Sequence, residues 1–289
     1  MASLLYNTLF QEITKPDTPI PLRVQISGVM GSTSLACWIV LLMPQLIEQW
    51  RLKSADGIAI GFISIWFLGD VFNLIGAVWA GLLPEVIFLA IWFCIADFMM
   101  IVSYVYYTFF YKKHHHKKHR RRTNSSNDEE RPLIRRRSST LTDIALEPQY
   151  HSIFVKYILP ILFVLGCGII GFYLGGSSSS DHDTPDEDTI AVGPQIMGYC
   201  SAVLYLGARI PQIIQNYQRK SVYGLSLLFF LFSVLGNLTY AGQILFYRSD
   251  SKYIVLNLSW LLGSLGTIFE DSLIFLQFYI YRQNEPVFE

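Results

Sequence analysis

The sequence predicts an all-α membrane protein with seven transmembrane helices. Three observations lead to this: 52% of the residues are apolar, the mean hydropathy is +0.36, and the charged residues, 15% of the chain, gather into a few blocks. A stretch of about 20 apolar residues can cross the hydrocarbon core of a bilayer. Seven such stretches follow one another, and we expect helices at 27–48, 58–80, 86–110, 154–175, 191–215, 225–247 and 254–281.

The stretch 191–215 is the least regular, because Pro194, Arg209 and Pro211 interrupt it. An internal duplication supports it. The segment MPQLIEQWRLKSADGIA, which starts at Met43, is repeated 167 residues later as IPQIIQNYQRKSVYGLS. Chance would give about one identity in such a window. The identical pairs are Pro44/Pro211, Gln45/Gln212, Ile47/Ile214, Lys53/Lys220, Ser54/Ser221 and Gly57/Gly224.

The charges predict the orientation of the chain. Loops one, three and five are basic, and the third holds the run Lys112–Arg122; loop two holds Glu85 and loop four is acidic between 181 and 188. Basic loops face the cytosol in most membrane proteins. We therefore expect a lumenal N-terminus and a cytosolic C-terminus. The first 26 residues lack the features of a cleaved signal peptide.

The duplication divides the chain into two three-helix repeats, 27–110 and 191–282, joined by a linker helix at 154–175. An odd linker helix gives both repeats the same orientation, so they are expected to be parallel bundles, a known plan among membrane transporters. The remaining segments are a lumenal tail, a disordered cytosolic loop, an acidic lumenal loop and a cytosolic tail, at 1–26, 111–153, 176–190 and 283–289.

Each repeat carries a Pro-Gln pair near the cytosolic end of its first helix, Pro44-Gln45 and Pro211-Gln212. Proline removes a backbone donor and weakens the helix there. A neighbouring glutamine can bind the freed carbonyl or a substrate, since polar groups at membrane depth need partners. We interpret both pairs as hinges; static kinks are the alternative.

Polar residues at membrane depth usually face a bundle interior or a water-filled pathway. Trp66, Asp70 and Asn73 share one face of the second helix, and their duplicates are Ser233, Asn237 and Tyr240. The two polar faces are expected to meet between the repeats. One carboxylate among amides, a phenol and a hydroxyl suits a small zwitterion with a cationic side chain, and Asp70 is the expected charge-recognising residue.

Three further intramembrane charges are candidates for proton or charge coupling: Asp97, Asp271 and Arg209. Burial can bring a carboxyl group into the working range for proton transfer. The two acids could equally form hydrogen bonds within their own bundles. Arg209, where the first repeat has Leu42, could pair with an acid, bind a substrate carboxylate or extend toward the lipid headgroups.

The seven helices, the two repeats and the paired Pro-Gln motifs resemble the PQ-loop family, and within it the vacuolar and lysosomal basic amino acid transporters. The resemblance implies a cavity between two bundles, alternating access hinged at the Pro-Gln sites, and transport of lysine, arginine or histidine. One difference concerns coupling, because the cystine-transporting branch has an aspartate at the position of Ser233. A carrier for cystine or a sugar, a receptor, and an occupancy sensor that recruits cytosolic partners remain alternatives.

The predicted cytosolic loop contains a candidate sorting signal. Glu129, Leu133 and Ile134 fit an acidic dileucine signal, which would bind a sorting adaptor complex on the way to the vacuole or lysosome. The basic run beside it is interpreted as a topology anchor near anionic lipid and not as a nucleic-acid site. We expect no metal, no cofactor and no enzymatic activity, because the spans lack paired metal ligands, a nucleophile with a base, and a phosphate-binding loop.

Overall fold

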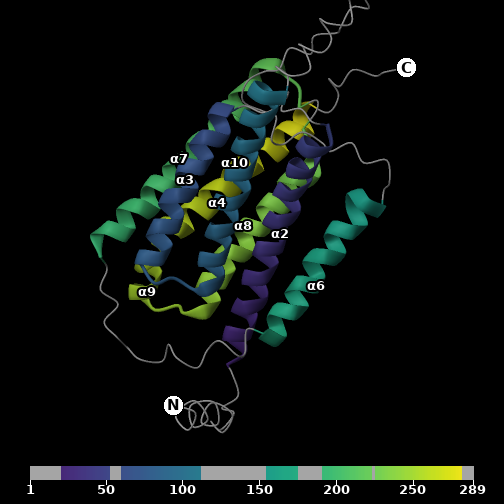
Figure 1. Ribbon diagram of the computed structural model, residues 1–289. Coiled ribbons are helices and arrows are strands. Elements are labelled where there is room, and N and C mark those ends of the chain that lie inside the picture. The colour runs from purple at the N-terminus through teal and green to yellow at the C-terminus, as the bar shows by residue number, and fades with distance from the viewer. Residues whose placement is uncertain (1–20, 53–59, 112–153, 175–190, 223–224, 282–289) are drawn as a thin grey trace, which may run out of the picture.

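The computed structural model describes residues 21–52, 60–111, 154–174, 191–222 and 225–281. In these ranges the chain is helical, and the predicted all-α membrane fold is confirmed (Figure 1). The long helices are α2 (Leu22–Leu52), α3 (Ile60–Trp79), α4 (Pro84–Val105), α6 (Leu159–Leu174), α7 (Val192–Arg219), α8 (Leu227–Tyr247) and α10 (Leu258–Tyr281). Three short elements accompany them: η1 (Tyr106–Tyr111), η3 (Phe154–Ile158) and α9 (Ser251–Leu256).

The expected span 254–281 is divided in the structure, with Asn257 between α9 and α10. The cause is local. The Asp250 carboxylate accepts a hydrogen bond from the Tyr253 amide at 3.1 Å and so caps a new helix start. The Asn257 side chain donates to the Tyr253 carbonyl at 2.9 Å, and side chains of this type compete with regular helical bonding.

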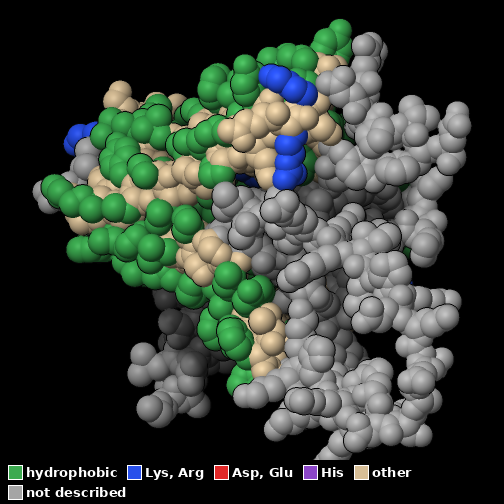
Figure 2. All heavy atoms as spheres, turned by 90° about the horizontal axis from the view of Figure 1, so that it is seen from above, with side chains coloured by type: hydrophobic (Ala, Val, Ile, Leu, Met, Phe, Trp, Pro, Cys, Tyr) green, Lys and Arg blue, Asp and Glu red, His purple; other side chains and the backbone are tan. Residues whose placement is uncertain are grey.

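The outer surface of the bundle is apolar. Four helical segments are long and apolar enough to cross a membrane, Leu22–Arg51, Pro84–Phe110, Leu227–Tyr247 and Leu258–Tyr281, and two shorter apolar helices are Ile63–Trp79 and Leu159–Phe172. Large side chains such as Phe88, Phe98, Leu238 and Phe269 are more than half exposed. Seen from the end at which α2 and α7 finish, hydrophobic side chains cover much of the surface formed by the described residues, and the charged side chains visible there are Lys and Arg (Figure 2). Such a surface suits contact with lipid.

The two repeats have the same internal packing. In the first, α4 contacts both α2 and α3; in the second, α10 contacts both α7 and α8. The third helix of each repeat therefore lies between the other two. Between the repeats, α2 packs on α8 and α3 packs on α7, so each contact joins a first helix to a second helix. Helix α6 packs against α2 at the side of the bundle (Figure 1).

Candidate functional site

A cavity lies between the two repeats. All six helices of the repeats line it, and the space between its walls is about 820 Å³, counting the open volume at its mouth. Five of the six residues predicted to bind substrate are in the lining: Trp66, Asp70, Asn73, Asn237 and Tyr240.

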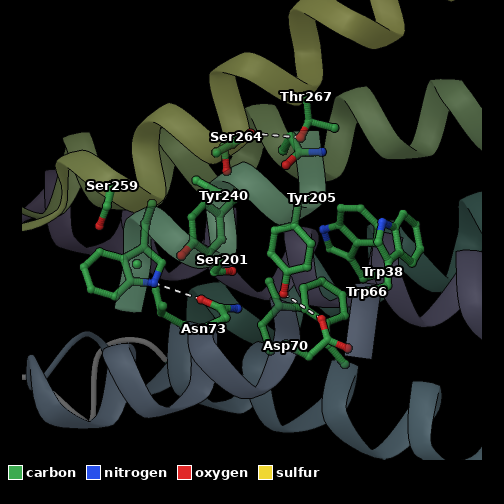
Figure 3. A pocket seen from close by; sticks show the side chains of 18 of the residues that line it. Trp38, Trp66, Asp70, Asn73, Ser201, Tyr205, Tyr240, Ser259, Ser264 and Thr267 are labelled. Carbon is green, nitrogen blue, oxygen red and sulfur yellow. Dashed lines mark hydrogen bonds between the residues drawn. The ribbon is translucent and has the colours of Figure 1, made fainter. Parts of the chain in front are cut away.

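Asp70 of α3 is the central polar group of the cavity. Its side chain is 3% exposed, and its Oδ1 accepts a hydrogen bond from the Tyr205 hydroxyl of α7 at 2.6 Å (Figure 3). The bond crosses the interface between the repeats. It can form because Gly69 lets the α7 side chain approach the backbone of α3; a Cβ at Gly69 would lie 2.9 Å from the Tyr205 ring.

A second acid, Asp97 of α4, also lines the cavity and is 2% exposed. Asp70 and Asp97 thus face the same cavity from two helices that pack against each other. The Oδ2 atoms of both residues are buried and receive no hydrogen bond from an N–H or hydroxyl group of the described residues. A buried acidic pair therefore faces the cavity without a cation of its own among these residues.

Other polar groups of the cavity connect the repeats at the level of the first turns of α10. The Trp260 indole donates to the Asn73 side-chain carbonyl at 2.9 Å. Tyr240 and Asn237 of α8 reach the same space, and the Asn237 amide donates to the Ser233 backbone carbonyl at 3.0 Å. The cavity thus combines carboxyl, amide and phenol groups with aromatic walls.

Ser233, the sixth predicted binding residue, is buried behind the lining. Its hydroxyl accepts from Arg209 Nη2 at 3.1 Å and donates to Asp271 Oδ2 at 2.6 Å. Arg209 lines the cavity, whereas Asp271 is fully buried and outside the lining. The three predicted coupling residues are therefore divided: Asp97 and Arg209 face the cavity, and Asp271 supports Arg209 from behind.

The proposed hinge residues lie beyond one end of the cavity. Helices α2 and α7 continue through Pro44 and Pro211, and the lining stops two residues earlier, at Leu42 and Arg209. The Gln212 side chain is 4% exposed, and its Nε2 has no hydrogen-bond acceptor among the described residues. The predicted sorting motif, Glu129, Leu133 and Ile134, lies outside the described residues.

Sequence reasoning missed Tyr205 and Trp260. The duplication contained the signal for Tyr205, because the offset of 167 residues pairs it with Trp38, and both aromatic residues line the cavity. A Cβ at Gly236 would lie 3.0 Å from Trp38 Nε1, which repeats the contact of Gly69 with Tyr205. For Trp260, only the packing of α10 shows that its indole reaches Asn73.

The sequence matches the PQ-loop repeat family twice, over residues 26–86 and 194–253. These matches span α2 with α3 and α7 with α8, which confirms the predicted duplication. The chain is also 35% identical to the vacuolar lysine transporter YPQ1 of Saccharomyces cerevisiae, over 91% of this chain and 96% of the relative. The chain belongs to the PQ-loop family.

Two further PQ-loop relatives cover nearly the whole chain. The vacuolar histidine transporter YPQ3 of Saccharomyces cerevisiae is 35% identical over 92% of this chain and 95% of its own. The lysosomal amino acid transporter 1 homolog of Gallus gallus is 32% identical over 90% of this chain and 82% of its own. All three relatives are named transporters and none is named an enzyme, so the prediction of a non-enzymatic membrane protein is confirmed.

Proposed function

We propose that the protein carries cationic amino acids such as lysine, arginine and histidine across the vacuolar or lysosomal membrane. The observation that carries the proposal is the buried pair of Asp70 and Asp97 in the central cavity. Among the described residues, Arg209 is the only cationic side chain that lines the cavity, and Asp271 partly neutralises it. An entering ammonium or guanidinium group would therefore meet carboxyl groups that have no cation of their own.

The energetics favour a cationic substrate over a neutral one. Charge pairing is much stronger in a buried site than in water, and an unpaired buried charge is costly. The aromatic side chains Trp66, Tyr205 and Tyr240 would add cation–π attraction at the walls. A sugar has no positive charge to pair with the two carboxyl groups. The names of the relatives, which refer to lysine, histidine and lysosomal amino acid transport, support the same substrate class.

The acidic pair also suggests how a proton could be exchanged for the substrate. Two ionised carboxylates in one buried cavity repel each other, and a proton on one of them removes this repulsion. We propose that one of Asp97 and Asp70 holds a proton, which the arriving cation displaces. The substrate would then leave as the proton returns.

The movement is proposed to be alternating access of the two bundles about Pro44 and Pro211. Support comes from their equivalent positions beyond the end of the cavity and from the missing backbone donor at each proline. The lumenal N-terminus, the cytosolic C-terminus and the adaptor-binding signal at Glu129, Leu133 and Ile134 belong to the same proposal. They rest on the loop charges and on the motif itself.

The test is uptake of labelled arginine, lysine, cystine and glucose into proteoliposomes that contain the purified protein. We expect saturable uptake of arginine and lysine and none of glucose. If the acidic pair exchanges protons for substrate, uptake should be faster when the vesicle interior is more acidic than the outside, because substrate and protons then move in opposite directions. If the pair does not exchange protons, the pH gradient should have no effect. Absence of uptake for all four solutes would overturn the carrier proposal and favour an occupancy sensor.

A further inference from the structure

Arg209 occupies an unusual position for a buried arginine. It projects from α7 into the cavity lining, and its side chain is 3% exposed. Three aromatic rings surround its guanidinium carbon, with centroids 5.4 to 5.6 Å away: Phe229, Phe230 and Trp66. The positive charge is thus held at a defined place between the repeats.

The hydrogen bonds of Arg209 are incomplete. A guanidinium has five N–H donors. Within the described residues, one hydrogen bond is formed, from Nη2 to the Ser233 hydroxyl at 3.1 Å. Arg209 Nε lies 3.5 Å from Asp271 Oδ1, and that oxygen receives no hydrogen bond. A direct arginine–carboxylate pair usually has distances of about 2.7–2.9 Å and often two parallel bonds.

This geometry differs from that of a purely structural ion pair. Buried charges are normally satisfied by their partners, because each unfilled donor or acceptor costs free energy. Asp271 makes its short bond, 2.6 Å, with the Ser233 hydroxyl and not with Arg209. Asp271 and Ser233 therefore position the guanidinium, while most of its donors are left for another acceptor.

We propose that Arg209 binds the α-carboxylate of the substrate, an inference that rests on the proposed transport of cationic amino acids. Such a substrate carries two positive groups and one negative group, and the cavity lining offers two carboxyl groups and one guanidinium. Arg209 is one helical turn beyond Tyr205 on α7, about 6 Å along the axis. Tyr205 bonds Asp70, so the four-carbon stem of lysine can span the distance between the two ends of the site.

The two repeats differ at this position, and the difference fixes the orientation of the substrate. The duplicate of Arg209 is Leu42, which also lines the cavity but has no donor. The carboxylate therefore has one binding group, on the α7 side, and the cationic end is directed to Asp70 and Asp97. Arg209 would thus distinguish an amino acid from an amine of the same length.

The test compares arginine with agmatine, which is arginine without its carboxylate. In proteoliposomes with the full chain, we expect agmatine to inhibit labelled arginine uptake at least tenfold more weakly than arginine does. The double variant Arg209→Leu/Asp271→Asn copies the residue of the first repeat and leaves no unpaired acid. In this variant the two compounds should become equally effective, with arginine weakened and agmatine unchanged. The matched control Asp271→Asn alone should keep the preference for arginine.

Thermal stabilisation of the purified protein by each compound gives a second measurement that does not need transport. If the double variant kept its preference for arginine, or if both compounds weakened equally, the proposal would be overturned, because Arg209 would then be structural. If the wild type transported neither compound but was stabilised more by arginine than by agmatine, and the double variant was not, the carboxylate site would stand and the carrier proposal would fail.

Discussion

The two helix interfaces that join the repeats are equivalent in position but different in chemistry. Where α2 meets α8, the Ser27 and Ser34 hydroxyls donate to the backbone carbonyls of Gln243 and Gly236, at 2.8 and 2.9 Å. Where α7 meets α3, the Tyr205 hydroxyl instead donates to the Asp70 side chain. The first interface is held by bonds to backbone, and the second presents an acid to the cavity.

The difference shows how two repeats with the same helix packing can form a cavity whose two sides carry different charges. The glycines that allow close packing are kept, because Gly69 and Gly236 are duplicates and each faces an aromatic ring of the opposite repeat. The chemistry changes at a few positions around them. Asp70 corresponds to Asn237, and Arg209 corresponds to Leu42. The negative and the positive group of the cavity therefore come from different repeats.

The largest expected effect comes from Asp70→Asn, which makes this position identical in charge to Asn237. Truncating one member of a buried charge pair costs about 2–5 kcal/mol, which is roughly 30-fold or more in affinity. We expect arginine and lysine uptake to fall by at least that factor, as measured in proteoliposomes under saturating and limiting substrate.

The matched control for Asp70→Asn is Asn237→Ala, at the equivalent position of the second repeat. It leaves the acidic pair intact, so its loss of uptake should stay below tenfold. Melting curves of both purified variants would show whether either is misfolded. Arginine uptake that is unchanged in a folded Asp70→Asn protein would contradict the assignment of Asp70.

The sequence predicted the helices and the polar faces because their signals are local. Apolar length fixes the spans, and the duplication places Asp70, Asn73, Asn237 and Tyr240 on equivalent faces, all of which line the cavity. Ser233 shares this periodicity but is buried behind the cavity. Its position depends on the neighbouring helices, since Arg209 and Asp271 hold its hydroxyl. Periodicity identifies the face of a helix and not which residues of another helix cover it.

The second prediction concerns the two duplicated glycines. In Gly69→Ala the new methyl group would lie 2.9 Å from the Tyr205 ring, and in Gly236→Ala it would lie 3.0 Å from Trp38 Nε1. Overpacking of this kind costs about 1–3 kcal/mol. Both variants should lose stability, but only Gly69→Ala displaces the hydroxyl that bonds Asp70. We expect Gly69→Ala to raise the KM for arginine several-fold more than Gly236→Ala does. Equal KM values for the two variants would contradict the functional difference between the two interfaces.

A third comparison concerns polar contacts beyond the prolines. Gln49 of α2 accepts a hydrogen bond from Ser103 of α4, and Asn216 of α7 donates to Gln277 of α10 at 2.8 Å. Gln49 and Asn216 are duplicates, five residues after Pro44 and Pro211. All four side chains are buried. Each repeat therefore ties the segment after its proline to its third helix.

Two double-mutant cycles would measure these contacts, one with Gln49→Leu and Ser103→Ala, the other with Asn216→Leu and Gln277→Leu. A hydrogen bond contributes about 0.5–1.5 kcal/mol net. We expect coupling energies in this range that agree between the repeats within about 0.5 kcal/mol, from thermal denaturation of the purified proteins. A coupling near zero in one repeat only would show that the two segments are fastened differently.

The smallest expected effect lies in the connections between the second and third helices of each repeat. In the first repeat, Gly81 has a φ of 62° and Pro84 begins α4, which has no side-chain cap. In the second, Asp250 caps α9 and also accepts from Arg248 Nε at 2.8 Å. One connection is set by backbone conformation, and the other by a charge.

A pH series distinguishes the two connections. The hydrogen bond from the Arg248 side chain lowers the pKa of Asp250 from its ordinary value of 3.8, and the hydrogen bond from the Tyr253 amide lowers it further. Because the folded-state pKa is the lower one, this stabilisation is complete above 3.8 and is lost as the pH falls through the folded-state value. The Tm of Asp250→Ala should therefore be slightly below that of the wild type at neutral pH, and this difference in Tm should disappear at acidic pH. Gly81→Ala should lower the Tm by the same amount at every pH, because the strain of a positive φ carries no charge. A gap for Asp250→Ala that persists at low pH would show that its carboxylate charge does not hold this connection.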